Sequence, residues 1–180
     1  MEEDFIKDKR VDKILAKRGY LDCEVFYSPI SIWLGYFLMF ILTGVGSVFY
    51  FMYQLWIGYP IIYLLVAYLL MARLNNSFAL AANELIIINP NFPFNKFKTY
   101  HTSEIKDVTI DSSKVLQYFL FIFIIFGVNY VEVRSHFGKK RFYCLGLEEE
   151  CYDEHQTEKT IEDLEASIKA KKVIVYFELY

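Results

Sequence analysis

The chain has 180 residues and a formal net charge of −3 at pH 7, and 55% of its residues are hydrophobic. This length accommodates one domain, and the hydrophobic share exceeds the roughly 45–50% of an ordinary globular protein. The three cysteines form no CxxC motif and no Cys/His metal spacing, which argues against a structural zinc site and favours a reducing compartment.

Residues 1–24 predict a short N-terminal cytoplasmic helix, because charged side chains are interspersed with Val11, Ile14 and Leu15. The apolar residues do not form a clean stripe, so the alternative is a frayed polar tail. The segment is acidic as well as basic and lacks the features of a secretory signal peptide.

A long uncharged run follows this segment. No Asp, Glu, Lys or Arg occurs between Val25 and Ala72, a run of 48 residues. One membrane crossing needs about 20 apolar residues, so the run predicts two crossings, Ile30–Tyr53 and Gly58–Ala72. Residues 25–74 are therefore predicted to form a transmembrane helical hairpin.

The basic residues give this hairpin an orientation. Six Lys or Arg residues precede it, Arg73 follows it, and its turn has none. Because basic residues stay on the cytoplasmic side, both termini are predicted to be cytoplasmic. The expected location is the bacterial inner (cytoplasmic) membrane, with a multi-pass topology.

Residues 75–180 are predicted to form a cytoplasmic domain built on an antiparallel sheet or a partly open barrel. Several short β-prone runs alternate apolar and polar residues and are separated by turn-forming residues. The expected strands are Ser77–Ala82, Glu84–Asn89, Lys98–His101, Ile105–Asp111, Tyr130–Phe137 and Arg141–Leu147, the last two joined by a turn at Gly138–Lys140.

A helix and one more strand are predicted near the C-terminus. Thr160 and Asp163 fit a capping box, and an apolar stripe follows at Ile161, Leu164 and Ile168. The last run is strongly β-prone. It either adds to the edge of the same sheet or pairs with a protein partner or another copy, and the residues expected to make this contact are Val173, Val175, Phe177 and Leu179.

The apolar segment 115–128 interrupts the predicted strands. Its fourteen residues are marginal for a crossing and typical of an interfacial or buried segment. We expect an insert that contacts the membrane. The alternatives are a strand or helix in the core of the domain and a third crossing.

The order of these elements resembles that of small bacterial membrane proteins with a two-helix hairpin and a pleckstrin-homology-like domain. The matching residues are the opening strands in Phe78–Ile88 and the run Thr102–Val108. The resemblance implies an α+β membrane protein with a PH-like sheet and a C-terminal amphipathic helix. The insert at 115–128 and the strand after the last helix depart from the pattern.

The sequence shows no motif for catalysis, metal binding or a cofactor. Its three histidines are scattered, and no GxSxG, HExxH or phosphate-binding glycine loop occurs. We therefore expect a non-enzymatic protein without a cofactor or nucleic-acid partner.

A set of basic residues is the candidate ligand site. It forms a rim for the headgroups of anionic lipids, or else the plain polar tip of a hairpin, and it comprises Lys96, Lys98, Lys106, Lys139, Lys140 and Arg141. The predicted function is a binding or scaffold module that presents its domain at the cytoplasmic face of the lipid bilayer to a protein partner or a lipid headgroup. The alternative is an immunity or envelope-stress protein that binds a membrane-active toxin.

Overall fold

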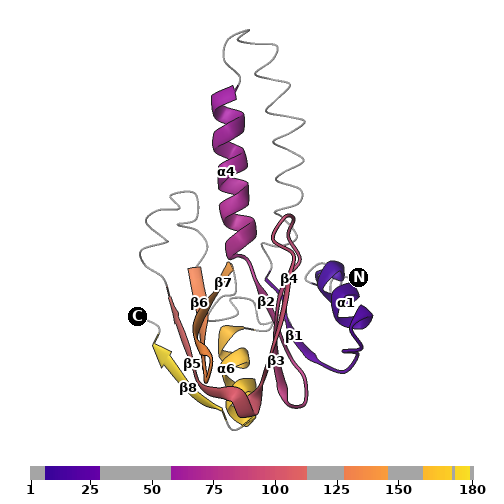
Figure 1. Ribbon diagram of the computed structural model, residues 1–180, viewed down its shortest axis with the longest axis vertical. Helices are drawn as coiled ribbons and strands as arrows, with labels where there is room; N and C mark the ends of the chain where they lie inside the picture. Colours follow the sequence, from indigo (N-terminus) through magenta and orange to yellow (C-terminus); the bar gives the residue numbers. More distant parts are fainter. Residues whose placement is uncertain (1–6, 29–57, 113–127, 146–159, 172, 179–180) are drawn as a thin grey trace, which may run out of the picture.

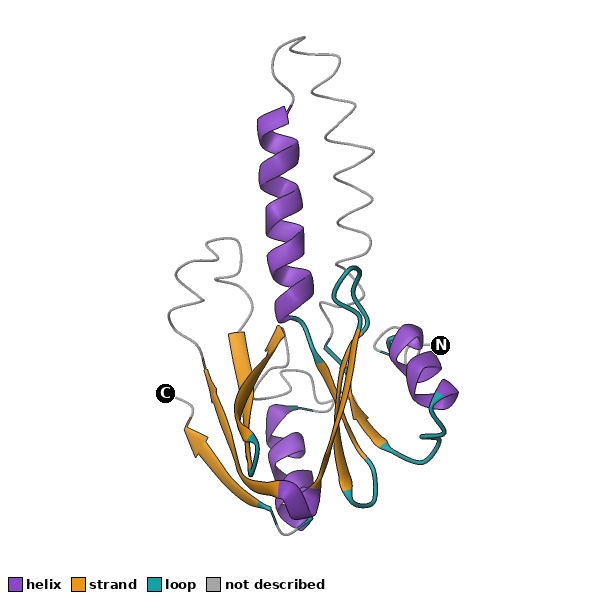
Figure 2. Ribbon diagram, viewed as in Figure 1, coloured by secondary structure: helices purple, strands orange, loops and turns teal. Residues whose placement is uncertain are grey.

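The computed structural model describes residues 7–28, 58–112, 128–145, 160–171 and 173–178, which form two β-sheets with helices around and between them (Figures 1 and 2). Sheet A has the order β1 (Glu24–Phe26), β2 (Ser77–Leu80), β3 (Glu84–Asn89) and β4 (Lys96–His101). Sheet B has the order β7 (Gly138–Leu145), β6 (Val128–Ser135), β5 (Ile105–Ser112) and β8 (Ile174–Glu178). The helices are α1 (Lys9–Lys17), α4 (Gly58–Leu74) and α6 (Ile161–Ala170), and a short 3₁₀ turn (Thr102–Glu104) joins β4 to β5.

Strand β3 is buried on both faces. Its residues Leu85–Ile88 are all buried. Leu85 and Ile87 face the space between the two sheets, while Ile86 and Ile88 pack against α1. A strand covered on both sides needs a continuous apolar run, which explains why β3 lacks the apolar–polar alternation of a half-exposed strand.

Helix α1 covers the outer face of sheet A. Its first turn is capped by Asp8, whose side chain accepts a hydrogen bond from the backbone N–H of Arg10. Val11 and Leu15, spaced four residues apart, are buried against the sheet. Within the segment 1–24, where an N-terminal helix was predicted, the structure has a helix at Lys9–Lys17, and Glu24 begins β1.

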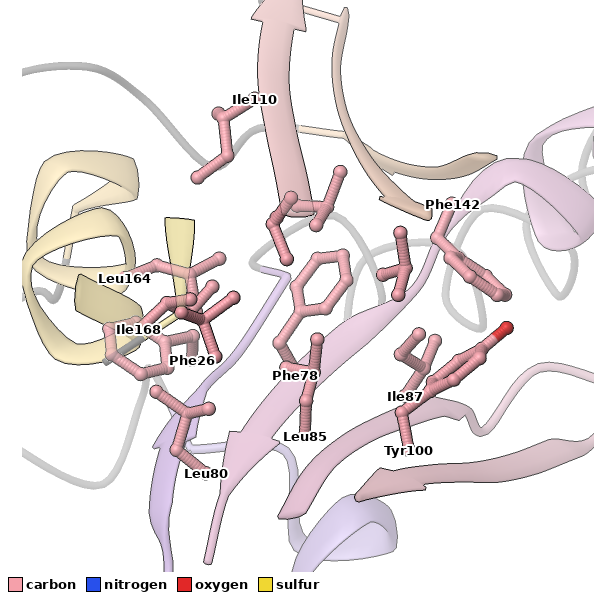
Figure 3. Packing of buried hydrophobic residues seen from close by; sticks show 14 of the residues in the cluster. Phe26, Phe78, Leu80, Leu85, Ile87, Tyr100, Ile110, Phe142, Leu164 and Ile168 are labelled. Atoms are coloured by element: carbon pink, nitrogen blue, oxygen red, sulfur yellow. The ribbon is translucent and has the colours of Figure 1, made fainter. Parts of the chain in front are cut away.

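The main core lies between the sheets, and α6 contributes to it (Figure 3). The capping box of Thr160 and Asp163 is present. The apolar stripe of α6 is buried with residues of both sheets. The members of this core are Phe26, Phe78, Leu80, Leu85, Ile87, Tyr100, Ile105, Val108, Ile110, Val131, Val133, Phe142, Cys144, Ile161, Leu164, Ile168 and Val173.

The predicted fold class is wrong in its sheet architecture. Instead of one antiparallel PH-like sheet or partly open barrel, the described strands form two four-stranded sheets, and β8 runs parallel to β5. A parallel pair of strands needs a crossover connection. Here β6, β7 and α6 lie between β5 and β8 in the chain. The strand β1, which pairs with β2, was not predicted.

The last hairpin is shifted relative to its prediction. Strand β7 begins at Gly138, where a turn was expected, and Ser135 of β6 pairs with Gly138. Gly138 has a φ of +125°, a conformation that glycine adopts without a steric penalty. Lys139 and Lys140 therefore belong to a strand and point to opposite faces of sheet B.

The structure also contradicts the predicted transmembrane hairpin. Among the described residues, no helix is both long enough and apolar enough to cross a membrane. Helix α4 (Gly58–Leu74) is the segment that was expected as the second crossing. Part of its apolar surface packs on the domain instead, since Tyr68, Met71 and Ala72 are buried.

This finding overturns the predicted membrane-protein class and the multi-pass location in the bacterial inner membrane. The expected first crossing, 30–53, lies outside the described residues. The predicted membrane-contacting insert, 115–128, also lies outside the described residues, except for its last residue, which begins β6.

Candidate functional site

The candidate site lies between the outermost strands β4 and β7, where the two sheets face each other. Alternation along β4 places Lys96, Lys98 and Tyr100 on one face, and the buried Tyr100 shows that this face is directed toward the main core. On β7 the buried Phe142 marks the corresponding face, which Lys140 shares. Each strand thus carries lysines next to a core aromatic residue.

The end of α4 is tied to both sheets beside this site. Asn89 of β3 donates a hydrogen bond through Nδ2 to the carbonyl oxygen of Ala72, at 2.7 Å. Asn76 donates two hydrogen bonds to the carbonyl oxygen of Tyr143 on β7, from Nδ2 at 2.8 Å and from its backbone N–H at 3.0 Å. These bonds hold the last turn of α4 and the residues that follow it against β3 and β7.

The two lysines of β4 lie over an aromatic floor. The Nζ atom of Lys96 is 4.9 Å from the ring centroid of Phe142, and that of Lys98 is 4.3 Å from the ring centroid of Tyr100. The two rings meet edge to face, with centroids 6.1 Å apart. Both ammonium groups are within cation–π range, which holds them against the two rings. We call the group formed by Arg73, Lys96, Lys98 and Lys140, with Tyr100 and Phe142, the basic notch.

The cations of the basic notch repel one another. Burial lowers the pKa of Lys96, and the positive charges of Lys98, Lys140 and Arg73 lower it further. None of these four side chains forms an ion pair with a carboxylate in the part of the chain that the structure describes. A bound anion would relieve this repulsion and stabilise the protonated form of Lys96.

A hydroxyl group without a hydrogen bond lies beside these cations. Tyr100 is only 6% exposed, and its Oη has no partner among the described residues. Burial raises the pKa of Tyr100, while the charge of Lys140 acts in the opposite direction. Figure 3 shows the hydroxyl directed away from the centre of the core, at the end that lies opposite α6. A buried donor left unpaired costs about 1–3 kcal/mol, which a ligand atom that accepts a hydrogen bond from it would recover.

The basic rim predicted from the sequence is divided by the structure. Lys96, Lys98 and Lys140 lie in the basic notch. Lys139 and Arg141 point to the opposite face of β7, where both contact the buried carboxylate of Glu132, at 2.7 Å and 2.6 Å. Lys106 is exposed on β5 and is not among the charges that act on Lys96.

Arg73 and Tyr100 were missed as site residues. The alternation Lys96, Lys98, Tyr100 along one strand could have indicated that a tyrosine lies on the same face as two lysines. Nothing in the sequence indicated that Arg73, 23 positions before Lys96, would lie beside it.

The predicted partner strand is β8, at the edge of sheet B. It pairs in parallel with β5. Val173 is buried in the main core, and Val175 packs against it. The side chain of Phe177 and all of Leu179 lie outside the described part of the chain.

Within the described ranges, no group of three His, Cys, Asp or Glu side chains is arranged as a metal site. Comparisons with protein-family models, with curated proteins and with solved structures gave no match. The class that the fold and the site define is therefore a two-sheet α+β domain with a basic notch between its edge strands, and the resemblance to PH-like membrane proteins stays a prediction.

Proposed function

We propose that this protein is a binding module that holds the phosphate group of an anionic ligand in the basic notch. The observation that carries the proposal is the buried hydroxyl of Tyr100, which lacks a hydrogen-bond partner among the described residues, on a residue that lies near Lys98 and Lys140, two cations of the basic notch. A phosphate group has several strong acceptor oxygens and matches both features, since it accepts from the hydroxyl and from the ammonium groups.

The chemistry of the notch is binding and orientation rather than bond breaking. The lysines and Arg73 supply positive charge, Tyr100 supplies one directional donor, and Phe142 keeps one wall of the site apolar. Phosphates in the headgroup of a lipid and on a protein partner share the chemistry that this site recognises.

The first test measures binding of sn-glycerol 3-phosphate to the full chain by equilibrium dialysis. The substitution Lys98→Gln should weaken binding about tenfold or more, because a hydrogen bond between charged groups contributes about 1.5–3 kcal/mol and about 1.4 kcal/mol is tenfold. Lys106→Gln is the matched control: it removes the same charge from β5, outside the notch, and should leave the affinity unchanged.

Tyr100→Phe separates ligand binding from a structural role. It removes an unpaired buried hydroxyl, so the unliganded protein should be as stable as the wild type or more so, while the affinity for glycerol phosphate falls severalfold. The proposal fails if glycerol phosphate does not bind, or if Lys98→Gln and Lys106→Gln have equal effects.

Binding should also depend on pH through Lys96. Because burial and its cationic neighbours lower the pKa of Lys96 in the free notch, and a bound phosphate raises it, binding should take up protons at pH values between the lowered pKa of free Lys96 and its raised pKa in the complex. Affinity should fall as the pH rises through the pKa of free Lys96. Calorimetry in buffers of different ionisation enthalpy measures the uptake, and Lys96→Arg should abolish it because arginine stays protonated at these pH values. Equal proton uptake by the wild type and the Lys96→Arg variant would contradict this assignment.

A further inference from the structure

Helix α4 exposes an apolar stripe that ends in a cation. Val66, Leu70 and Arg73 are spaced as i, i+4 and i+7 and therefore share one face of the helix. Val66 is 49% exposed and Leu70 is 46% exposed, and Arg73 is exposed as well. The helix projects beyond both sheets (Figure 1), so this face is not covered by them.

The stripe and the basic notch share the residue Arg73. Arg73 is one of the charges that act on Lys96. Lys96 pairs across the sheet with Asn89, and the side chain of Asn89 is hydrogen-bonded to the carbonyl oxygen of Ala72 at the end of α4. The last turn of α4 thus lies next to β3 and β4, and Arg73 belongs both to the stripe and to the charges of the basic notch.

We propose that the phosphate ligand of the basic notch is a lipid, whose phosphate lies in the notch and whose acyl chain lies along the face of α4 that carries Val66 and Leu70. This inference rests on the proposed function and names its ligand class. Exposed apolar side chains on a helix favour the binding of an apolar group that covers them. The cations at the end of the stripe favour a ligand that carries negative charge at one end.

The test compares two ligands that share a phosphate and differ in the chain. Binding of 1-myristoyl-lysophosphatidic acid, kept below its critical micelle concentration, is measured against sn-glycerol 3-phosphate with the full chain. Each buried methylene tightens binding about fourfold, so even partial burial of the chain should make the lysolipid bind at least about tenfold more tightly. Lys98→Gln should weaken the binding of both ligands.

Leu70→Gln tests the apolar stripe, because glutamine forms helix about as well as leucine. It should weaken lysolipid binding about fivefold or more and leave glycerol phosphate binding unchanged. Phe92→Gln is the matched control. Phe92 is 73% exposed, but its carbonyl oxygen accepts a hydrogen bond from the Tyr68 hydroxyl at 2.8 Å. Tyr68 is two residues, more than half a helical turn, from Leu70, so Phe92 lies away from the stripe.

The outcomes separate the lipid assignment from the function on which it rests. Equal affinity for the two ligands overturns the lipid and leaves the phosphate site standing, whereas failure of glycerol phosphate to bind overturns the phosphate site and the lipid assignment that rests on it. Tight lysolipid binding that neither Leu70→Gln nor Val66→Gln weakens, or that Phe92→Gln weakens equally, also overturns the lipid assignment. Circular dichroism of each variant verifies that it is folded, and Val66→Gln replaces Leu70→Gln if the latter is not.

Discussion

Replacing Phe78 with alanine should lower the free energy of unfolding by about 3–5 kcal/mol, the range for a buried phenylalanine truncated to alanine. Phe78 is fully buried at the centre of the main core (Figure 3). In sheet A it lies between Phe26 on β1 and Ile87 on β3, its register partners. Because core side chains from both sheets and from α6 meet around this position, the neighbours cannot all move inward to fill the space.

Urea denaturation followed by circular dichroism measures this loss as a lower transition midpoint. Phe137→Ala is the matched control, since Phe137 is 87% exposed at the turn between β6 and β7, and its truncation should change stability by less than about 0.5 kcal/mol. Similar losses for the two variants would mean that the space between the sheets is not the main core.

The strands of this domain were largely predictable because their signal is local. Alternating apolar residues identified β5 and β6, and the continuous apolar run in β3 identified a strand whose two faces are both buried. The capping box of Thr160 and Asp163 placed the start of α6. Each of these features depends on residues close together in the chain, and the physical cause of each acts over the same short range.

The division into two sheets was not predictable in the same way. Whether β8 joins β5 in parallel or pairs elsewhere depends on how α6, which precedes β8 in the chain, packs into the main core, and that packing involves residues far apart in the sequence. The same reason applies to α4. Its uncharged composition predicted an apolar helix, but its length and its packing through Tyr68, Met71 and Ala72 depend on the rest of the fold.

The basic notch was predictable in part. The sequence predicts one site of six basic residues. Because successive side chains of a strand point to opposite faces, Lys140 lies on the other face of β7 from its neighbours Lys139 and Arg141. Recognising that β7 begins at Gly138 would have made this separation visible in the sequence. The unpaired hydroxyl of Tyr100 could not be predicted, because it depends on which groups surround it in three dimensions.

The cations that lie outside the notch should matter for stability instead. Glu132 is 4% exposed on the outer face of sheet B, and its carboxylate contacts Lys139 Nζ and Arg141 Nε. Burial raises its pKa, but the hydrogen bonds from Arg141 and Lys139 together outweigh burial, and the pKa of Glu132 is lowered. The pair therefore stabilises the fold above the unfolded-state pKa of glutamate, and this stabilisation is lost as the pH falls through the lower, folded-state pKa.

Removing both cations with Lys139→Met and Arg141→Met should leave a buried carboxylate without a partner. The expected loss at pH 7 is about 2–3 kcal/mol, below the 3–5 kcal/mol typical of fully buried pairs, because both cations are half exposed and water reaches them. In this variant burial acts alone and raises the pKa of Glu132, so the penalty is present at neutral pH. It should shrink as the pH falls through the ordinary pKa of glutamate, about 4.3, because the carboxyl then becomes protonated in the unfolded state as well.

Adding Glu132→Gln to the two methionine substitutions is the control for this prediction. The triple variant has no buried charge, so it should regain most of the lost stability at pH 7, and its stability should vary less with pH than that of the double variant. Urea midpoints of the three proteins between pH 4 and pH 7 measure both effects. If the double variant matched the wild type, or the triple variant regained nothing, Glu132 would not be a buried charge that depends on Lys139 and Arg141. The outer face of sheet B would then have to be stabilised by the side chains of Tyr130 and Tyr143, which pack edge to face across β6 and β7.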